Sequence, residues 1–168
     1  MHTRNFEKIT KYQNVKIPMP TRKTPMSAGY DIACAKQVTI LPGETAFVET
    51  GLKCYMLPGE VLELHIRSSS ATKRKLRLVN CTGIIDGDYY NNPDNEGHIL
   101  GCVENFGKEP QVIHKDDVIL QGLFLKHLVT DTDDKAQMIE FDHNTGNYVA
   151  TQHARKGGFG STDSAPKD

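Results

Sequence analysis

Residues 67–71 read Arg-Ser-Ser-Ser-Ala and carry side chains that bind phosphate. A guanidinium beside consecutive hydroxyls and free backbone N–H groups can cradle a polyphosphate. A short helix beginning at these serines would add the attraction of its N-terminus for an anion. The alternative is a solvated basic loop, since residues 73–75 are Lys-Arg-Lys.

Residues 78–90 hold a second candidate centre of chemistry. An apolar Ile-Ile pair at 84–85 runs directly into Asp86, and Tyr89 follows three residues later. A β-branched pair followed by an acid, a glycine and an aromatic predicts a buried hairpin that presents a carboxylate and a ring at its mouth. An ordinary hairpin closed by an Asp-Gly turn is the alternative.

Three further segments carry polar groups that could reach a ligand. Asp31 stands at the start of a strand behind a loop, where a cap or turn residue is the ordinary role. Gln121 lies in an apolar strand, and its amide either contacts a ligand or satisfies a neighbouring strand. Residues 157–162, Gly-Gly-Phe-Gly-Ser-Thr, have the groups needed to close over a phosphate while stacking on a base. A disordered terminus is the alternative for this last segment.

Short strands separated by turns must position these groups. Leu-Pro-Gly-Glu occurs at residues 41–44 and again at 57–60, a spacing that fits turns between antiparallel strands. The alternating pattern predicts an edge strand at 15–20, further strands at 30–35, 37–40, 45–52, 61–66, 98–103, 111–114, 119–129 and 138–141, and a short helix at 69–75. The predicted fold class is all-β, a barrel or jelly roll.

Length, charge and cysteine content narrow the class of protein. The 168 residues predict one domain, and 20 basic against 21 acidic residues argue against nucleic-acid binding. The four cysteines (Cys34, Cys54, Cys81 and Cys102) form no Cys-x-x-Cys pair and no zinc-ligand spacing with histidine. With no leader and no long apolar run, we expect reduced thiols in a cytoplasmic protein that does not enter a membrane.

Taken in order, these segments resemble the five motifs of the trimeric dUTP pyrophosphatase (dUTPase) family. The motifs read Ala-Gly-Tyr-Asp at 28–31, Arg-Ser-Ser-Ser-Ala at 67–71, Asn80 with Gly-Ile-Ile-Asp-Gly-Asp-Tyr at 83–89, the Gln121 strand, and Gly-Gly-Phe-Gly-Ser-Thr at 157–162. The resemblance spans roughly residues 25–162. It implies a distorted jelly roll over residues 1–146, a homotrimer with shared active sites, and a flexible glycine-rich arm at 147–168 that closes over a neighbouring site.

By this resemblance the reaction is hydrolysis of dUTP to dUMP and pyrophosphate. Asp86 is implied to be the general base that deprotonates a water attacking the α-phosphorus, which requires it within hydrogen-bond reach of that water. Mg²⁺ on the phosphate oxygens is the implied cofactor. Asp31 is implied to hold this ion through water, since Mg²⁺ usually keeps several of its waters.

The resemblance also assigns residues to each part of the substrate. The implied phosphate ligands are Arg67, Ser68, the Ser69 amide and nearby Gln121, with Ser161, Thr162 and Gly160 of the arm at the terminal phosphates and Arg155 on the γ-phosphate. The implied contacts to uracil are Asn80, the backbone at Gly83, Ile84 and Ile85, neighbouring Leu100, and a stacked Phe159. Tyr89 is implied to pack under the deoxyribose and leave no room for a 2′-hydroxyl.

The chain departs from the family pattern at several positions. Residues 91–96 are inserted where the usual pattern turns almost at once, either as a decoration or as a contact for a regulatory protein. Ser69 replaces a usual glycine, and residues 116–118 lack the customary arginine of the fourth motif. Arg155 and Lys156 each miss the usual register of the arm's arginine, so which of them contacts the terminal phosphate is open.

Two rival functions remain. A dCTP deaminase of the same fold needs a glutamate three residues before the asparagine that ends the strand after the hairpin. That position is Cys102 here, and Glu104 lies two residues further along. A dUTPase-fold protein that also binds a regulatory protein is the second rival, and the inserted residues 91–96 are the feature that would support it.

Overall fold

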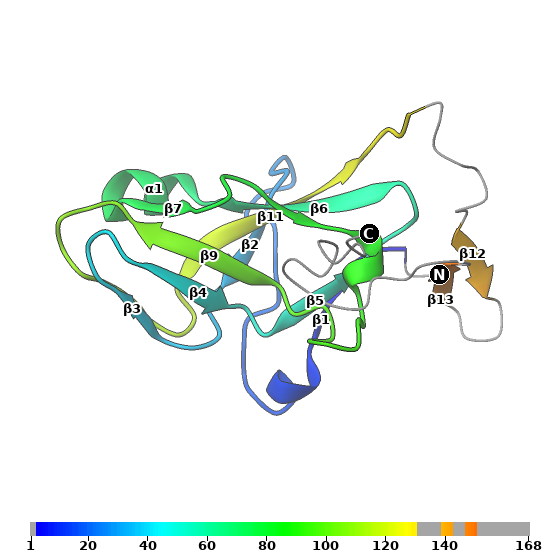
Figure 1. The fold of residues 1–168 in the computed structure, drawn as a ribbon, viewed down its shortest axis with the longest axis horizontal. Coiled ribbons are helices and arrows are strands. Elements are labelled where there is room, and N and C mark those ends of the chain that lie inside the picture. The colour runs from blue at the N-terminus through cyan, green and yellow to red at the C-terminus, as the bar shows by residue number, and fades with distance from the viewer. Residues whose placement is uncertain (1–2, 131–138, 143–146, 151–168) are drawn as a thin grey trace, which may run out of the picture.

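The computed structural model describes residues 3–130, 139–142 and 147–150. Thirteen strands lie in these ranges, with a single α-helix among the described residues (Figure 1). The strands are β1 (Asn5–Lys8), β2 (Tyr30–Ala33), β3 (Val38–Ile40), β4 (Thr45–Glu49), β5 (Leu52–Tyr55), β6 (Glu60–Ile66), β7 (Leu76–Leu78), β8 (Gly83–Ile85), β9 (Leu100–Asn105), β10 (Gln111–Ile113), β11 (Val118–Lys126), β12 (Ile139–Asp142) and β13 (Asn147–Ala150). The helical elements are α1 (Ser68–Arg74) and the 3₁₀ turns η1 (Thr10–Tyr12) and η2 (Gly87–Tyr89).

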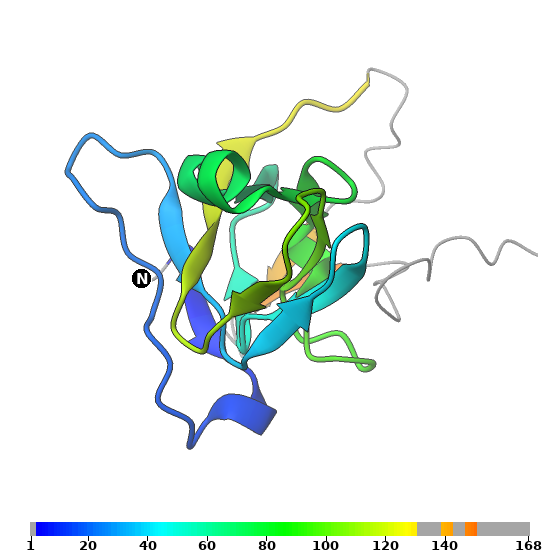
Figure 2. The same cartoon turned by 90° about the vertical axis from the view of Figure 1, so that its left-hand side faces the viewer.

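The strands β1 to β11 form small antiparallel sheets around one interior, as the end-on view shows (Figure 2). The largest sheet has the order β2-β11-β6-β8, and a second sheet has the order β4-β9-β7. Three further pairs, β1 with β5, β3 with β10 and β12 with β13, complete the described pairings. The predicted all-β jelly-roll class is confirmed.

Alternating side chains of these strands fill the interior. Along β6, Leu62 and Leu64 point inward and are at most 1% exposed, while the alternate residues Val61, Glu63 and His65 are partly exposed. The other large side chains that are almost fully buried come from most of the sheets: Ile32, Ile40, Val48, Leu52, Leu76, Ile99, Val103, Ile113, Ile119 and Leu120. Each such side chain contributes about 1.5–3 kcal/mol to stability on burial, so one chain has a complete core.

The N-terminal third differs from the prediction. Residues 15–20 form no strand, and the two prolines among them remove N–H donors that a ladder needs. The strand of this region is instead β1, which pairs with β5. The predicted strand 45–52 is divided at Gly51, whose φ of +70° ends β4 before β5 begins.

Residues 78–90 do not form the predicted two-stranded hairpin. β8 pairs with β6, and β7 pairs with β9, so the chain passes from one sheet to the other between β7 and β8. Asp86 is the N-cap of the 3₁₀ turn η2, which takes the place of the expected two-residue Asp-Gly turn. A period-two pattern fixes which face of a strand is buried but not which strand it pairs with. The sequence pattern therefore predicts the wrong partner for β8.

The remaining predicted elements are close to those observed. The short helix predicted at 69–75 is α1, and the strand predicted at 138–141 corresponds to β12. In the part of the chain that the structure describes, no helix is long and apolar enough to cross a membrane. The boundary predicted at residue 146 stays a prediction, because most of the arm lies outside the described residues.

Candidate active site

Three of the five segments meet at one end of the largest sheet. β11 is flanked by β2 and β6, and its Gln121 lies opposite Asp31 on one side and His65 on the other. Gly29 makes room for this arrangement, because a Cβ there would lie 2.8 Å from the Gln121 Oε1. Gln121 also donates from Nε2 to the Ile66 carbonyl at 3.4 Å. Its amide therefore lies between the segment at residues 28–31 and the segment at residues 67–71.

Arg67 joins this group from the end of β6. Its backbone N–H donates to the Ile119 carbonyl at 2.8 Å, and its Nε lies 3.2 Å from Asp31 Oδ1. Arg67 is also the N-cap of α1, whose first helical bond runs from the Ala71 N–H back to the Arg67 carbonyl. The amides before Ala71 consequently have no acceptor within the helix. Ser68 and Ser69, which carry two of these amides, are exposed.

The Asp31 carboxylate has one satisfied and one unsatisfied oxygen. Its Oδ2 is buried and has no hydrogen-bond partner, a distinction that no other side-chain polar atom in the described residues shares. The Lys23 ammonium lies 3.7 Å from this oxygen, which is beyond hydrogen-bond distance. Leaving a buried acceptor unsatisfied costs about 1–3 kcal/mol. Such an oxygen, aimed at basic groups, is suited to accept from the water shell of a cation.

The third segment forms a separate group built on β8. Gly83 lets β8 approach β6 closely, since a Cβ there would lie 3.1 Å from that of Leu64. Ile84 is 53% exposed and Ile85 is buried, so the strand presents one apolar side chain outward. Asp86 is exposed at the start of η2.

Asn80 and Leu100 lie near one another at the junction of β7 and β9. The Val79 N–H donates to the Cys102 carbonyl at 3.0 Å, which brings the adjacent Asn80 toward the start of β9. Asn80 is exposed and Leu100 is partly exposed there. An amide and an apolar side chain in this position can contact the edge of a flat ring.

Tyr89 is almost fully buried, with 6% of its surface exposed. Its hydroxyl donates to the His98 carbonyl at 3.1 Å and accepts from the Asn95 Nδ2 at 2.8 Å. The ring is thus held in one orientation by residues that follow it in the chain. A fixed aromatic face can exclude groups by shape.

The two groups lie at opposite ends of β6 within one chain. Ile85 pairs with Leu62, so Asp86 falls opposite Val61, whereas Arg67 follows the other end of the strand. At about 3.3 Å for each residue, the path along the strand between them is roughly 20 Å. One chain therefore does not bring Asp86 to the Arg67 group.

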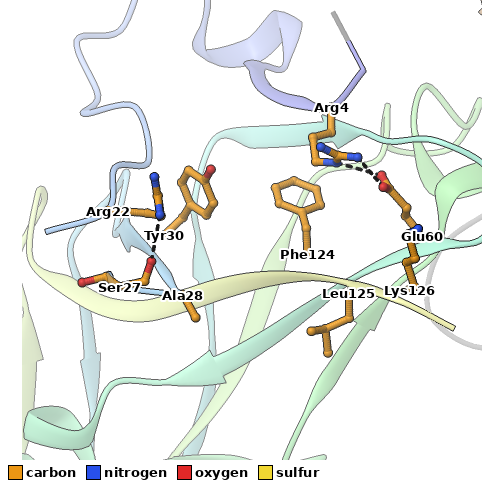
Figure 3. A pocket seen from close by; sticks show the side chains of 9 residues that line it. All are labelled: Arg4, Arg22, Ser27, Ala28, Tyr30, Glu60, Phe124, Leu125 and Lys126. Atoms are coloured by element: carbon orange, nitrogen blue, oxygen red, sulfur yellow. Dashed lines mark hydrogen bonds and ion pairs between the residues drawn. The ribbon is translucent and has the colours of Figure 1, made fainter. Parts of the chain in front are cut away.

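A pocket of about 360 Å³ lies next to the first motif, whose Ala28 and Tyr30 line it. Its lining residues are Arg4, Arg22, Ser27, Ala28, Tyr30, Glu60, Phe124, Leu125 and Lys126 (Figure 3). Arg4 and Glu60 bind one another across it, and these hydrogen bonds lower the pKa of the Glu60 carboxyl. None of the residues expected to contact substrate lines this pocket.

Two residues of these groups were not predicted from the sequence pattern. Lys23, from the loop before β2, faces Asp31, and Asn95, from the inserted loop, contacts Tyr89. The only signal for Lys23 was the basic character of residues 21–29, and nothing in the pattern singled out Asn95. The remaining expected site residues, Arg155, Phe159, Gly160, Ser161 and Thr162, lie outside the described residues.

Comparison with known proteins identifies the family. The dUTPase family model matches residues 15–162. The deoxyuridine 5′-triphosphate nucleotidohydrolase of Lactococcus lactis is 46% identical over 162 residues, covering 96% of this chain and 99% of the relative. The crystal structure of dUTPase from Streptococcus mutans has a TM-score of 0.72 and 43% identity, covering 76% of this chain and 98% of that one. A dUTPase from phage phi11 of Staphylococcus aureus, at 21% identity and a TM-score of 0.66, shares the fold and covers 79% of this chain and 96% of that one. The chain belongs to the dUTPase family.

Proposed function

We propose that this protein hydrolyses dUTP to dUMP and pyrophosphate at sites shared between the copies of a homotrimer. The observation that carries the proposal is the meeting of Asp31, Arg67 and Gln121 at one end of the largest sheet, in a chain 46% identical to a deoxyuridine 5′-triphosphate nucleotidohydrolase. Three motifs far apart in sequence supply a cation, an amide and a carboxylate to one place, which suits a polyphosphate.

The shared site follows from the separation of the two groups. A general base must lie within hydrogen-bond reach of the water that it deprotonates, and that water attacks the same phosphate chain that Arg67 binds. The path of roughly 20 Å along β6 is too long for Asp86 and Arg67 of one chain to serve one substrate. We infer that Asp86 of one copy faces Arg67 of another.

The chemistry assigned to this chain's residues is a single displacement. Asp86 accepts a proton from water as the water oxygen bonds to the α-phosphorus, and the bond from that phosphorus to the bridging oxygen breaks to release pyrophosphate. Arg67, the Ser68 hydroxyl and the Ser69 amide offset the phosphate charge. Asn80, Leu100 and the backbone of residues 83–85 form the uracil contacts, and Tyr89 faces the sugar.

Mg²⁺ is the proposed cofactor, and Asp31 is the residue that would hold it. The unsatisfied, buried Asp31 Oδ2 fits an outer-sphere contact to a hydrated cation. The described residues contain no group of three or more His, Cys, Asp or Glu that could hold a metal by themselves, which fits an ion carried mainly by phosphate oxygens. Bound there, Mg²⁺ supplies charge neutralisation of the triphosphate.

Residues 147–168 are proposed to act as an arm that closes over a neighbouring site. Phe159 would stack on the base, while Arg155, Gly160, Ser161 and Thr162 meet the terminal phosphates. Deletion after Gly146 is expected to leave the oligomer intact and nearly abolish turnover. Unaffected turnover in size-matched oligomers would remove the arm from the mechanism.

The deaminase alternative finds no support in the geometry around β9. Glu104, the carboxylate nearest to the required position, is held by Arg77 in two hydrogen bonds of 2.9 and 3.0 Å. Cys102 occupies the required position itself. The four cysteines are all free thiols, and on that ground we propose the cytoplasm as the location.

The decisive experiment measures pyrophosphate release from dUTP, dTTP, dCTP and UTP, with and without Mg²⁺. Native protein should act on dUTP alone and require Mg²⁺. The variant Asp86→Asn keeps the shape of the side chain but cannot accept the proton, so turnover should fall by about 10²–10⁴-fold. Ammonia release from dCTP, or full turnover in Asp86→Asn, would contradict the proposal.

A further inference from the structure

The inserted residues 91–96 form a closed loop whose polar groups are largely used within the chain. The Asn91 N–H donates to the Glu96 carbonyl at 3.1 Å, and the Glu96 N–H donates back to the Asn92 carbonyl at 3.0 Å. The Asn92 Oδ1 accepts from the backbone N–H groups of Asp94 and Asn95, each at 3.1 Å. Asn92 is 4% exposed. These hydrogen bonds hold the loop in one conformation.

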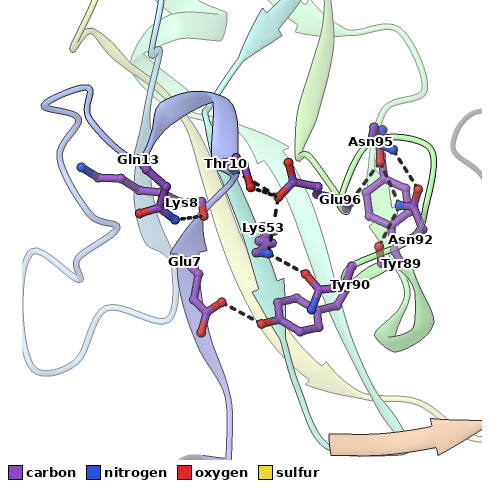
Figure 4. A network of polar contacts seen from close by, with 12 residues as sticks. Glu7, Lys8, Thr10, Gln13, Lys53, Tyr89, Tyr90, Asn92, Asn95 and Glu96 are labelled. Atoms are coloured by element: carbon purple, nitrogen blue, oxygen red, sulfur yellow. Dashed lines mark hydrogen bonds and ion pairs between the residues drawn. The ribbon is translucent and has the colours of Figure 1, made fainter.

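The loop is also fixed to the N-terminal part of the chain (Figure 4). The Glu96 carboxylate accepts from the Thr10 N–H at 3.1 Å and from the Thr10 hydroxyl at 2.9 Å. These bonds lower the pKa of Glu96. Lys53 lies 3.7 Å from the same carboxylate and donates to the Asn91 side-chain oxygen. The loop therefore has a fixed base on η1 and β5.

The opposite side of the loop holds Tyr89. The Asn92 Nδ2 donates to the Tyr89 carbonyl at 2.9 Å, and the Asn95 Nδ2 donates to the Tyr89 hydroxyl at 2.8 Å. Asn95 is itself braced, because its Oδ1 accepts from the Asn92 Nδ2 at 2.8 Å and from the Gly97 N–H at 3.0 Å. Both the backbone and the far end of the Tyr89 ring are attached to the insertion.

We propose that the inserted loop positions Tyr89, with Asn95 as the positioning residue that sharpens discrimination against a 2′-hydroxyl. This inference rests on the proposed function, in which Tyr89 faces the deoxyribose. A ring excludes one extra oxygen only if it cannot tilt or retreat, and Tyr89 is tied at its hydroxyl and at its carbonyl. Contact of residues 91–96 with a regulatory protein stays a prediction.

Truncation of the amide provides the test. In Asn95→Ala, the ratio of kcat/KM for dUTP to kcat/KM for UTP should fall about fivefold, the effect of one neutral hydrogen bond. In Asn95→Asp the new carboxylate cannot donate to the Tyr89 hydroxyl, whose single proton is already donated to the His98 carbonyl, so the ratio should stay low. Asn5→Ala, a truncation on β1 away from the site, is the matched control and should leave the ratio unchanged.

Tyr89→Phe removes the same bond from the ring side and serves if Asn95→Ala does not fold. Tyr89→Phe should lower the ratio, and adding Asn95→Ala to it should lower the ratio no further. A loop with a merely structural role would lower the thermal midpoint and leave the ratio intact. Active Asn95→Ala and Tyr89→Phe variants with native ratios would overturn this inference alone. Native protein that releases no pyrophosphate from dUTP would overturn the proposed function and this inference with it.

Discussion

The separation of Asp86 from Arg67 makes a quantitative prediction for mixed oligomers. Asp86→Asn lacks the base but keeps an intact Arg67, and Arg67→Ala lacks the phosphate ligand but keeps an intact Asp86. Each variant alone should be nearly inactive. If Arg67 of one copy faces Asp86 of the next copy around a ring of three, a mixed trimer of either composition has one boundary where both residues are intact, which is about one third of native activity.

The assay uses co-expression with two different affinity tags and purification on both tags in sequence, so that only mixed trimers remain. Pyrophosphate release from dUTP is then measured per trimer, with doubly tagged native protein as the reference. Loss of the general base lowers turnover by about 10²–10⁴-fold, so one third of native activity stands far above the background. Mixed trimers no more active than the parent variants would mean that one chain supplies both residues, and the reasoning from the β6 register would be wrong.

Two further predictions follow from single residues. Burial lowers the pKa of His98 to about 4, and the neutral ring accepts a hydrogen bond from the Gly51 N–H at 2.9 Å. As the pH falls, the histidine of the unfolded chain is protonated before the buried one. The free energy of unfolding should therefore be at its full value above pH 6.5 and fall by about 1.4 kcal/mol per pH unit between pH 6.5 and about 4. Urea unfolding at pH 7.5 and 5.5, at one protein concentration, should show this loss in native protein and a smaller loss in His98→Gln; equal losses would exclude His98 as the titrating group. Gly29→Ala would place a Cβ 2.8 Å from the Gln121 Oε1. Because that amide is the movable end of a side chain, it should be displaced, so that KM for dUTP rises while the unfolding midpoint changes little. An unchanged KM would remove Gln121 from the substrate site.

Residue patterns were sufficient for several elements around the candidate site, but not for the pairing of β8 with β6. The strand positions of β6 and β9, the short helix α1 and the order of the motifs are all readable from alternation, turn residues and polar groups at strand ends. The placement of Asp31 opposite Gln121 could not be read in this way, because pairing between β2 and β11 joins residues some ninety positions apart. Nothing local encodes such a partner.

The structure of the inserted loop could not be predicted from the sequence for a different reason. Residues 91–97 read Asn-Asn-Pro-Asp-Asn-Glu-Gly, a composition typical of a solvated turn. Composition does not tell which amide bonds which carbonyl, and here Asn92 is buried while Glu96 reaches a threonine 86 positions earlier in the chain. The loop is ordered by specific acceptors that only the fold brings within reach.

The two groups that we propose to form the shared site are each ordered within one chain. Arg67 is held through its backbone to Ile119 and through its guanidinium to Asp31, and Tyr89 is held at its hydroxyl and carbonyl by the inserted loop. Because folding of one chain already restricts these side chains, we expect assembly of the proposed site and binding of a nucleotide to require little further ordering. Asp31 Oδ2 is the exception, because it is buried without a hydrogen bond and its ion-pair partner, Lys23, lies 3.7 Å away. We propose that this oxygen helps to hold a hydrated cation that arrives with the nucleotide, which would couple binding of the metal to binding of the substrate.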